Sequence, residues 1–251
     1  TKLDQCLLET TFLLEIVKDK NVAIVGPAPY LEGQNRGAEF DKYDVIVRPN
    51  EIVPPEHLRM DYGSRTDILF CNFGDIWMPG IKRKIERDDH DSHFKNIKLV
   101  VGSAVKSNHS QTNFLSWSND HVSSIPSNFQ SINKHNLPFY WIGVEDYKKI
   151  YQKIGVEFNT GIAAIVMLLC YPIKTLNIAG FTFYKNGKSY KDLYYEGHMD
   201  SLDQEGRSFG FHSGHGYHVN QKQINYAKQL IIEKDYSEKI KIDKQLRETL
   251  S

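Results

Sequence analysis

The sequence contains little cysteine, no long apolar run and no net charge. Its 251 residues include three cysteines that are odd in number and far apart, Cys6, Cys71 and Cys170, which indicates reduced thiols in a cytoplasmic protein. No stretch approaches the roughly 20 apolar residues of a membrane span, and the first residues show no signal-peptide cleavage pattern. Lysine plus arginine and aspartate plus glutamate number 31 each, so an extended nucleic-acid footprint, which needs a basic excess, is not expected.

Two common nucleotide-binding fingerprints are also absent. Gly26 ends a predicted strand, but Pro27-Ala28-Pro29 after it forms neither GxGxxG nor a phosphate loop with Gly-Lys-Ser/Thr. This argues against the usual dinucleotide and NTPase sites. A tight turn here leaves backbone amides able to face an anion, and an ordinary structural turn is an equal alternative.

Short apolar runs rich in β-branched residues alternate with helical patterns along the chain. They predict strands at 22–26, 43–50, 67–72, 97–103, 138–143 and 175–181, and an apolar helix at 161–173 that Pro172 ends. This alternation predicts an α/β fold, one Rossmann-like domain over 1–251 with a mostly parallel sheet. Ligands of such sheets bind beyond the carboxyl ends of the strands.

Three further segments complete the predicted domain. The apolar pattern of 1–20 fits an amphipathic helix that packs on the domain. Residues 104–135, rich in serine and asparagine, are expected to form a flexible lid or insertion, or a plain surface excursion. Residues 220–251 are expected to be helical, with a solvated helix from Ile231 onward or, alternatively, peripheral contact with a membrane.

Several segments together resemble the sialyl motifs of the animal-type sialyltransferases. Residues 21–50 resemble the long motif, with Pro27 where the family carries asparagine, and 62–68 ("YGSRTDI") resemble the segment that follows it. Residues 158–184 resemble the short motif, with Asn159 in place of serine. Residues 193–197 ("LYYEG") are similar to the aromatic motif, and 216–223 ("GYHVNQKQ") to the very short motif, with Gln223 in place of glutamate. The matching positions are Gly26, Gly37, Asp41, Asp44, Arg48, Asn50, Thr160, Gly161, Cys170, Gly180, Phe181 and His218.

The resemblance implies a variant of the GT-A-like sialyltransferase fold and a metal-independent glycosyltransferase. Such an enzyme moves a 2-keto acid sugar, sialic acid or Kdo, from its CMP-activated donor to a glycan hydroxyl. Bacterial CMP-Kdo transferases of polysaccharide biosynthesis resemble the same superfamily. The family's disulfide between the long and short motifs cannot form, because no cysteine lies near residue 21. The acceptor is expected to be an oligosaccharide, lipopolysaccharide or capsule glycan, and the enzyme to work in the cytoplasm or at the inner face of a membrane.

The candidate site follows from the same motifs. By the resemblance His218 is the general base, since a histidine titrates near neutral pH, and His215 or His212 donates to the donor phosphate. The candidate donor-binding residues are Gly26, Pro27, Ala28, Asn50, Asn159, Thr160, Gly161, Gly180, Phe181, Tyr194 and Tyr195.

Two other functions remain as alternatives. The three histidines suggest a metal-binding hydrolase, but their spacing within a glycine-rich run is not that of a helical zinc site. The Asp89-His90-Asp91 cluster is interpreted as a solvated face, so no metal or other cofactor is expected. The departures at Pro27, Gln223 and Leu193, which stands where the aromatic motif has histidine, suggest a non-catalytic nucleotide- or sugar-binding protein of the same fold.

Overall fold

The computed structural model describes residues 11–50, 54–74, 78, 81–82, 92–103, 124–155, 158–183, 220–233 and 238–251. These residues form a parallel sheet of seven strands in the order β5-β4-β3-β2-β1-β6-β7. The strands are β1 (Asn21–Val25), β2 (Val45–Pro49), β3 (Ile68–Cys71), β4 (Leu99–Gly102), β5 (Phe139–Trp141), β6 (Thr175–Ala179) and β7 (Ile240–Ile242). The sheet confirms the predicted α/β class. Strands β2 to β6 lie within the predicted runs, and β1 begins one residue before the predicted 22–26.

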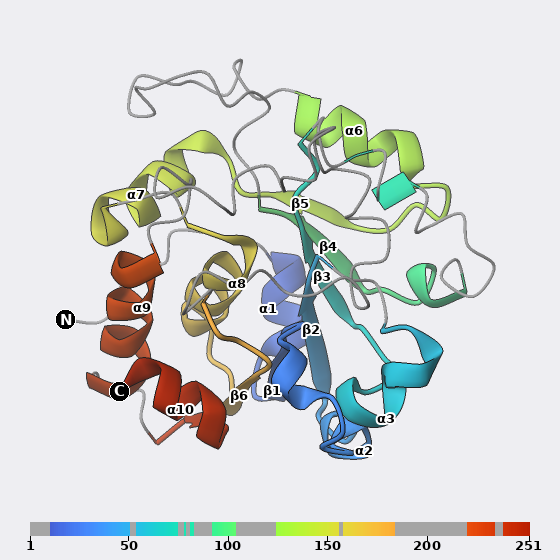
Figure 1. The fold of residues 1–251 in the computed structure, drawn as a ribbon. Coiled ribbons are helices and arrows are strands. Elements are labelled where there is room, and N and C mark those ends of the chain that lie inside the picture. Colours follow the sequence, from blue (N-terminus) through green and yellow to red (C-terminus); the bar gives the residue numbers. More distant parts are fainter. Residues whose placement is uncertain are drawn as a thin grey trace, which may run out of the picture.

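Helices cover both faces of this sheet (Figure 1). The α-helices are α1 (Thr11–Val17), α2 (Gly37–Phe40), α3 (Arg59–Tyr62), α6 (Ser124–Ile132), α7 (Val144–Ile154), α8 (Thr160–Leu169), α9 (Asn220–Lys228) and α10 (Lys244–Leu250). Two 3-10 helices, η1 (Pro29–Leu31) and η2 (Glu56–Leu58), and a π-helical segment at Gln229–Glu233 accompany them. Figure 1 shows α8 on one side of the central strands and α2 and α3 on the other. None of the described helices is long and apolar enough to cross a membrane.

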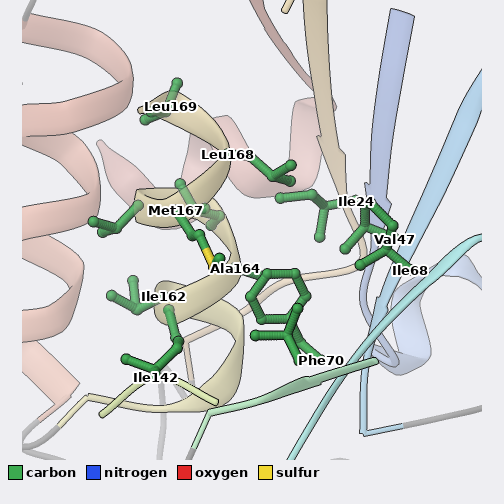
Figure 2. Packing of buried hydrophobic residues seen from close by; sticks show 14 of the residues in the cluster. Ile24, Val47, Ile68, Phe70, Ile142, Ile162, Ala164, Met167, Leu168 and Leu169 are labelled. Carbon is green, nitrogen blue, oxygen red and sulfur yellow. The ribbon is translucent and has the colours of Figure 1, made fainter. Parts of the chain in front are cut away.

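The core is divided by the alternation of side chains along the central strands. Val22 and Ile24 of β1 belong to the larger cluster, which also contains residues 162–169 of α8. Ala23 and Val25 belong to a smaller cluster under η1, α2 and α3. Figure 2 shows Leu168 of α8 directed toward Ile24. Because both faces are covered, the strands read as continuous apolar runs, and this is why the sequence reveals them.

Two segments differ from their predicted structure. The predicted C-terminal helical region contains β7, which pairs with β6, so the expectation of a solvated helix is wrong at 240–242. In the predicted lid or insertion, α6 buries Ile125, Phe129 and Ile132 in the main core. Residues 104–123 lie outside the described residues, as do 1–10 of the predicted N-terminal helix. Of its remaining residues, Thr11–Val17 form α1, and 18–20 are not helical.

Candidate active site

The carboxyl ends of neighbouring strands carry the residues that the sequence predicts for the donor site. Gly26 follows β1, Asn50 follows β2 and Gly180 follows β6. The chain leaves β1 toward β2, while β6 and β7 lie on the opposite side of β1. In open α/β sheets ligands bind beyond the strand ends where the order reverses in this way. The topology therefore places these residues where a ligand is expected.

Gly26 and Gly180 bring the two loops at this reversal into backbone contact. The amide of Gly26 donates to the carbonyl of Ala179 (2.8 Å), and the amide of Ala28 donates to the carbonyl of Gly180 (3.0 Å). A β-carbon on Gly26 would lie 2.3 Å from the carbonyl oxygen of Gly180, so only glycine fits. Pro27 has no amide donor. The donors of this turn are thus used within the protein, which favours the structural-turn alternative for 26–28.

The Phe181 ring joins this turn to the start of α8. Its Cε2 atom would lie 3.0 Å from a β-carbon on Gly26, and its Cε1 atom 2.6 Å from one on Gly161. The ring therefore lies between two glycines that have no side chain to displace it. Phe181 is almost fully buried, so it forms the base of the site.

The N-terminus of α8 presents unused backbone donors. Asn159 caps the helix, because its Oδ1 accepts from the amide of Ile162 (2.9 Å). Within the described part of the chain, the amides of Thr160 and Gly161 donate no hydrogen bond. First-turn amides lack an intrahelical acceptor, and the helix dipole adds positive potential there. Asparagine in place of the family's serine therefore preserves the helix cap. The first-turn amides are left available to an anion.

Gln223 links this helix start to α9. Its Oε1 accepts from the backbone amide of Asn159 (3.3 Å), and its side chain is buried. Gln223 lies in α9, so this bond connects α9 to the start of α8. The amide oxygen of glutamine accepts as a carboxylate would, but without a charge to bury.

Ser103 extends the site across the sheet, and the predicted residues did not include it. It follows β4, its amide donates to the carbonyl of Cys71 (3.0 Å), and its hydroxyl donates to that of Thr160 (3.2 Å). Ser103 is buried, whereas Thr160 is partly exposed. The signal available in the sequence was its position at the end of the predicted strand 97–103.

Asn50 does more than open a turn. It adopts a positive φ of 59°, its amide donates to the carbonyl of Phe70 (2.6 Å), and its Oδ1 accepts from the amide of Asn72 (3.1 Å). The Oδ1 of Asn72, which was also not predicted, accepts in turn from Gly74 (2.9 Å). The Nδ2 of Asn50 donates to none of the described residues, so it remains a donor for a ligand at this edge.

Other positions of the long motif stabilise the fold. Arg48 is fully buried and donates to the carbonyls of Tyr62 (2.7 Å) and Arg65 (3.0 Å). Asp41 accepts from the amide and hydroxyl of Ser64. The carboxylate of Asp44, the residue before β2, accepts from the amide of Asn21 at the start of β1. This hydrogen bond lowers the pKa of the Asp44 carboxyl.

The remaining predicted site residues, His212, His215, His218, Tyr194 and Tyr195, lie outside the described residues, as does the Asp89-His90-Asp91 cluster. Among the residues that are described, no three side chains of His, Cys, Asp or Glu are grouped as metal ligands would be. A cavity of about 410 Å³ opens at the β7 side of this edge. It is lined by Tyr30, Gln34, Arg36, Asp243, Lys244 and Gln245.

Comparison with known proteins gives the fold and the family of this chain. Two solved structures of a mammalian sialyltransferase, one in complex with Gal-beta-1-3GalNAc-ortho-nitrophenol, share the fold. Each is 18% identical in sequence, has a TM-score of 0.52, and is matched over 95% of this chain and 72% of its own. No curated protein gives a significant match. The model of glycosyltransferase family 29 (sialyltransferase) matches residues 17–230. The chain belongs to glycosyltransferase family 29, the sialyltransferases.

Proposed function

We propose that this glycosyltransferase moves a 2-keto acid sugar, sialic acid or Kdo, from its CMP ester to a hydroxyl of a glycan acceptor. Family membership supports the sugar-transfer chemistry. One structural observation carries the proposal: hydrogen bonds link the carboxyl ends of β2, β3 and β4 to the start of α8. Asn72 bonds to Asn50, and Ser103 bonds both to the carbonyl of Cys71, the residue before Asn72, and to the hydroxyl of Thr160. Enzymes of this kind need a row of hydrogen-bond donors and acceptors beside a nucleotide phosphate.

The donor binds, in this proposal, over the start of α8. The amides of Thr160 and Gly161 and the hydroxyl of Thr160 meet the phosphate or the sugar carboxylate, because both are anions and the helix dipole favours them. The Nδ2 of Asn50 contacts the ribose or the phosphate. The buried Phe181 ring supports this surface from below.

The transfer step forms one bond and breaks one. The acceptor oxygen attacks the anomeric carbon of the keto sugar, the bond from that carbon to the phosphate oxygen breaks, and CMP leaves with the bonding electrons. His218 takes the proton of the acceptor hydroxyl, and His215 or His212 donates to the departing phosphate. Tyr194 and Tyr195 line the sugar. No metal is required, since amides, hydroxyls and an imidazolium offset the charge of one phosphate.

Ligand binding and turnover test the proposal in two steps. Thermal shifts with CMP, CDP, UDP and NAD are expected to show stabilisation by CMP and CDP. CMP-sialic acid and CMP-Kdo are then compared as donors, with and without EDTA. A preference for UDP or NAD, or loss of activity in EDTA, contradicts the proposal.

A pair of threonine variants tests the site itself. Thr160→Val removes a hydroxyl at the carboxyl edge, and Thr175→Val removes a comparable one at the amino end of β6, where it donates to Asn21 (2.8 Å). Both side chains are partly exposed. Thr160→Val is expected to weaken CMP binding about tenfold, whereas Thr175→Val leaves it unchanged. His218→Ala is expected to abolish transfer while CMP binding persists.

A further inference from the structure

The hydroxyl of Tyr30 lies where the ends of three strands meet. Tyr30 belongs to η1, directly after the β1 turn, and its hydroxyl accepts from the amides of Gly180 (2.7 Å) and Phe181 (3.2 Å) at the end of β6. It donates to the Oδ2 atom of Asp243 (2.8 Å), which follows β7. A hydroxyl has one donor and two acceptor positions, so this arrangement uses all of them.

Asp243 is itself held in place from two sides. Its Oδ1 accepts from the amide of Leu246 (2.7 Å) and so caps α10, and the Nη1 atom of Arg36 lies 3.6 Å from its Oδ2. Its side chain is 8% exposed. Burial and the nearby Asp243 carboxylate raise the pKa of Tyr30 well above its usual range, so the hydroxyl keeps its proton and continues to donate.

The two amides bound by Tyr30 belong to the residues that shape the donor site. Gly180 has a φ of +78°, which turns its amide and that of Phe181 toward one point, as in backbone sites for anions. Here that point is filled by the phenol oxygen. The carbonyl of Gly180 accepts from Ala28, and the Phe181 ring lies between Gly26 and Gly161. A shift of this corner therefore moves the ring that supports the start of α8.

We propose that Tyr30, hydrogen-bonded to Asp243, is a positioning residue for the donor site. It fixes the Gly180–Phe181 corner, and through the Phe181 ring it fixes the spacing between the β1 turn and the amides of Thr160 and Gly161. The C-terminal strand and helix thereby contribute to donor binding without touching the donor. This inference rests on the proposed function for the identity of the donor nucleotide.

Tyr30→Phe tests the role of the hydroxyl, with Tyr43→Phe as the matched control. Both tyrosines are partly buried against the smaller core cluster, but within the described residues the Tyr43 hydroxyl makes no hydrogen bond. We expect Tyr30→Phe to weaken CMP binding about tenfold, because two buried amides lose their acceptor. The affinity is measured by calorimetry at a temperature well below that of unfolding. Tyr43→Phe is expected to leave CMP affinity within twofold of the parent. Asp243→Ser retains a cap for α10, but its side chain is too short to reach Tyr30. Its CMP affinity is expected to lie between those of Tyr30→Phe and Tyr43→Phe.

A second measurement needs no ligand. Amide hydrogen exchange at the start of α8 is expected to be faster in Tyr30→Phe than in Tyr43→Phe, because the Phe181 support is loosened. If Tyr30→Phe lowers the unfolding temperature but leaves both CMP affinity and this exchange unchanged, Tyr30 is merely structural and the inference is overturned. If the parent protein does not bind CMP, the proposed function fails, and the exchange comparison still decides whether Tyr30 positions α8.

Discussion

The contact between Gly26 and Gly180 leads to a quantitative prediction about three glycine-to-alanine substitutions. Gly180 combines a φ of +78° with a position at which a β-carbon would lie 2.2 Å from the carbonyl oxygen of Gly26. Gly33 has the same φ of +78°, but no atom lies within 4 Å of its would-be β-carbon. Gly26 has the close contact, 2.3 Å, without a positive φ. The three positions therefore separate backbone strain from steric contact.

The expected losses follow from these distances. A left-handed conformation costs an alanine about 1–2 kcal/mol, which is the whole effect at Gly33. Real β-carbons stay at least 3.0 Å from such atoms, so at Gly180 the two loops must also separate by about 0.8 Å. Overpacking of this kind costs about 1–3 kcal/mol. We therefore expect a loss of about 3 kcal/mol for Gly180→Ala and about 2 kcal/mol for Gly26→Ala.

Thermal unfolding followed by circular dichroism measures these losses. For a chain of this size 1 kcal/mol corresponds to about 2–4 °C, so Gly33→Ala is expected to lower the midpoint by about 2–8 °C and Gly180→Ala by about 6–12 °C. Equal midpoints for Gly33→Ala and Gly180→Ala would refute the close approach of the two loops. A neutral Gly26→Ala would refute it as well, because that substitution carries no backbone strain.

Three further predictions concern the helix cap, the alkaline limit and the buried arginine. Asn159→Ala is expected to lower the free energy of unfolding, measured by urea denaturation, by about 1 kcal/mol because the α8 cap is lost. Asn159→Ser, which can also cap the helix, is expected to retain most of that stability. Burial, followed by the nearby Asp146 carboxylate, raises the pKa of Tyr140. The contribution of this group to the free energy of unfolding is therefore complete below about pH 10 and is lost as pH rises further. Between pH 9 and 11 the thermal unfolding midpoint is expected to fall less steeply in Tyr140→Phe than in the parent. Arg48→Met leaves the buried carbonyl of Tyr62 and the partly buried carbonyl of Arg65 without their charged donor, and it is expected to cost about 3 kcal/mol in the same urea assay. A loss below 1 kcal/mol contradicts the role assigned to that side chain.

The sequence predicted the central strands well because each is buried on both faces. Residues 22–25 and 45–47 are apolar without a break, which is the pattern of a covered parallel strand. β7 gave no such signal, because it has three residues, lies at the edge of the sheet and exposes Lys241. Its identity as a strand comes from pairing with β6, and a local pattern does not contain that information.

The candidate site was predicted by position rather than by contact. The rule that ligands bind beyond strand ends located Gly26, Asn50 and Gly180 correctly at the carboxyl edge. The partners of these residues come from distant parts of the chain. Tyr30 meets Gly180 across 150 residues, and Gln223 meets Asn159 across 64. Such pairings depend on how helices pack over the sheet, so no local spacing reveals them.

The place of β1 in the sheet has a consequence for the order in which the protein forms during synthesis. β1 pairs with β2, which follows it closely in the sequence, but its other edge pairs with β6, for example where Thr175 bonds to Asn21 across 154 residues. Until β6 leaves the ribosome, that edge is open and prone to pairing with other chains. Contacts this distant in sequence also slow folding. The carboxyl edge that carries the candidate site needs both neighbours of β1, so it is completed only after β6 has been made.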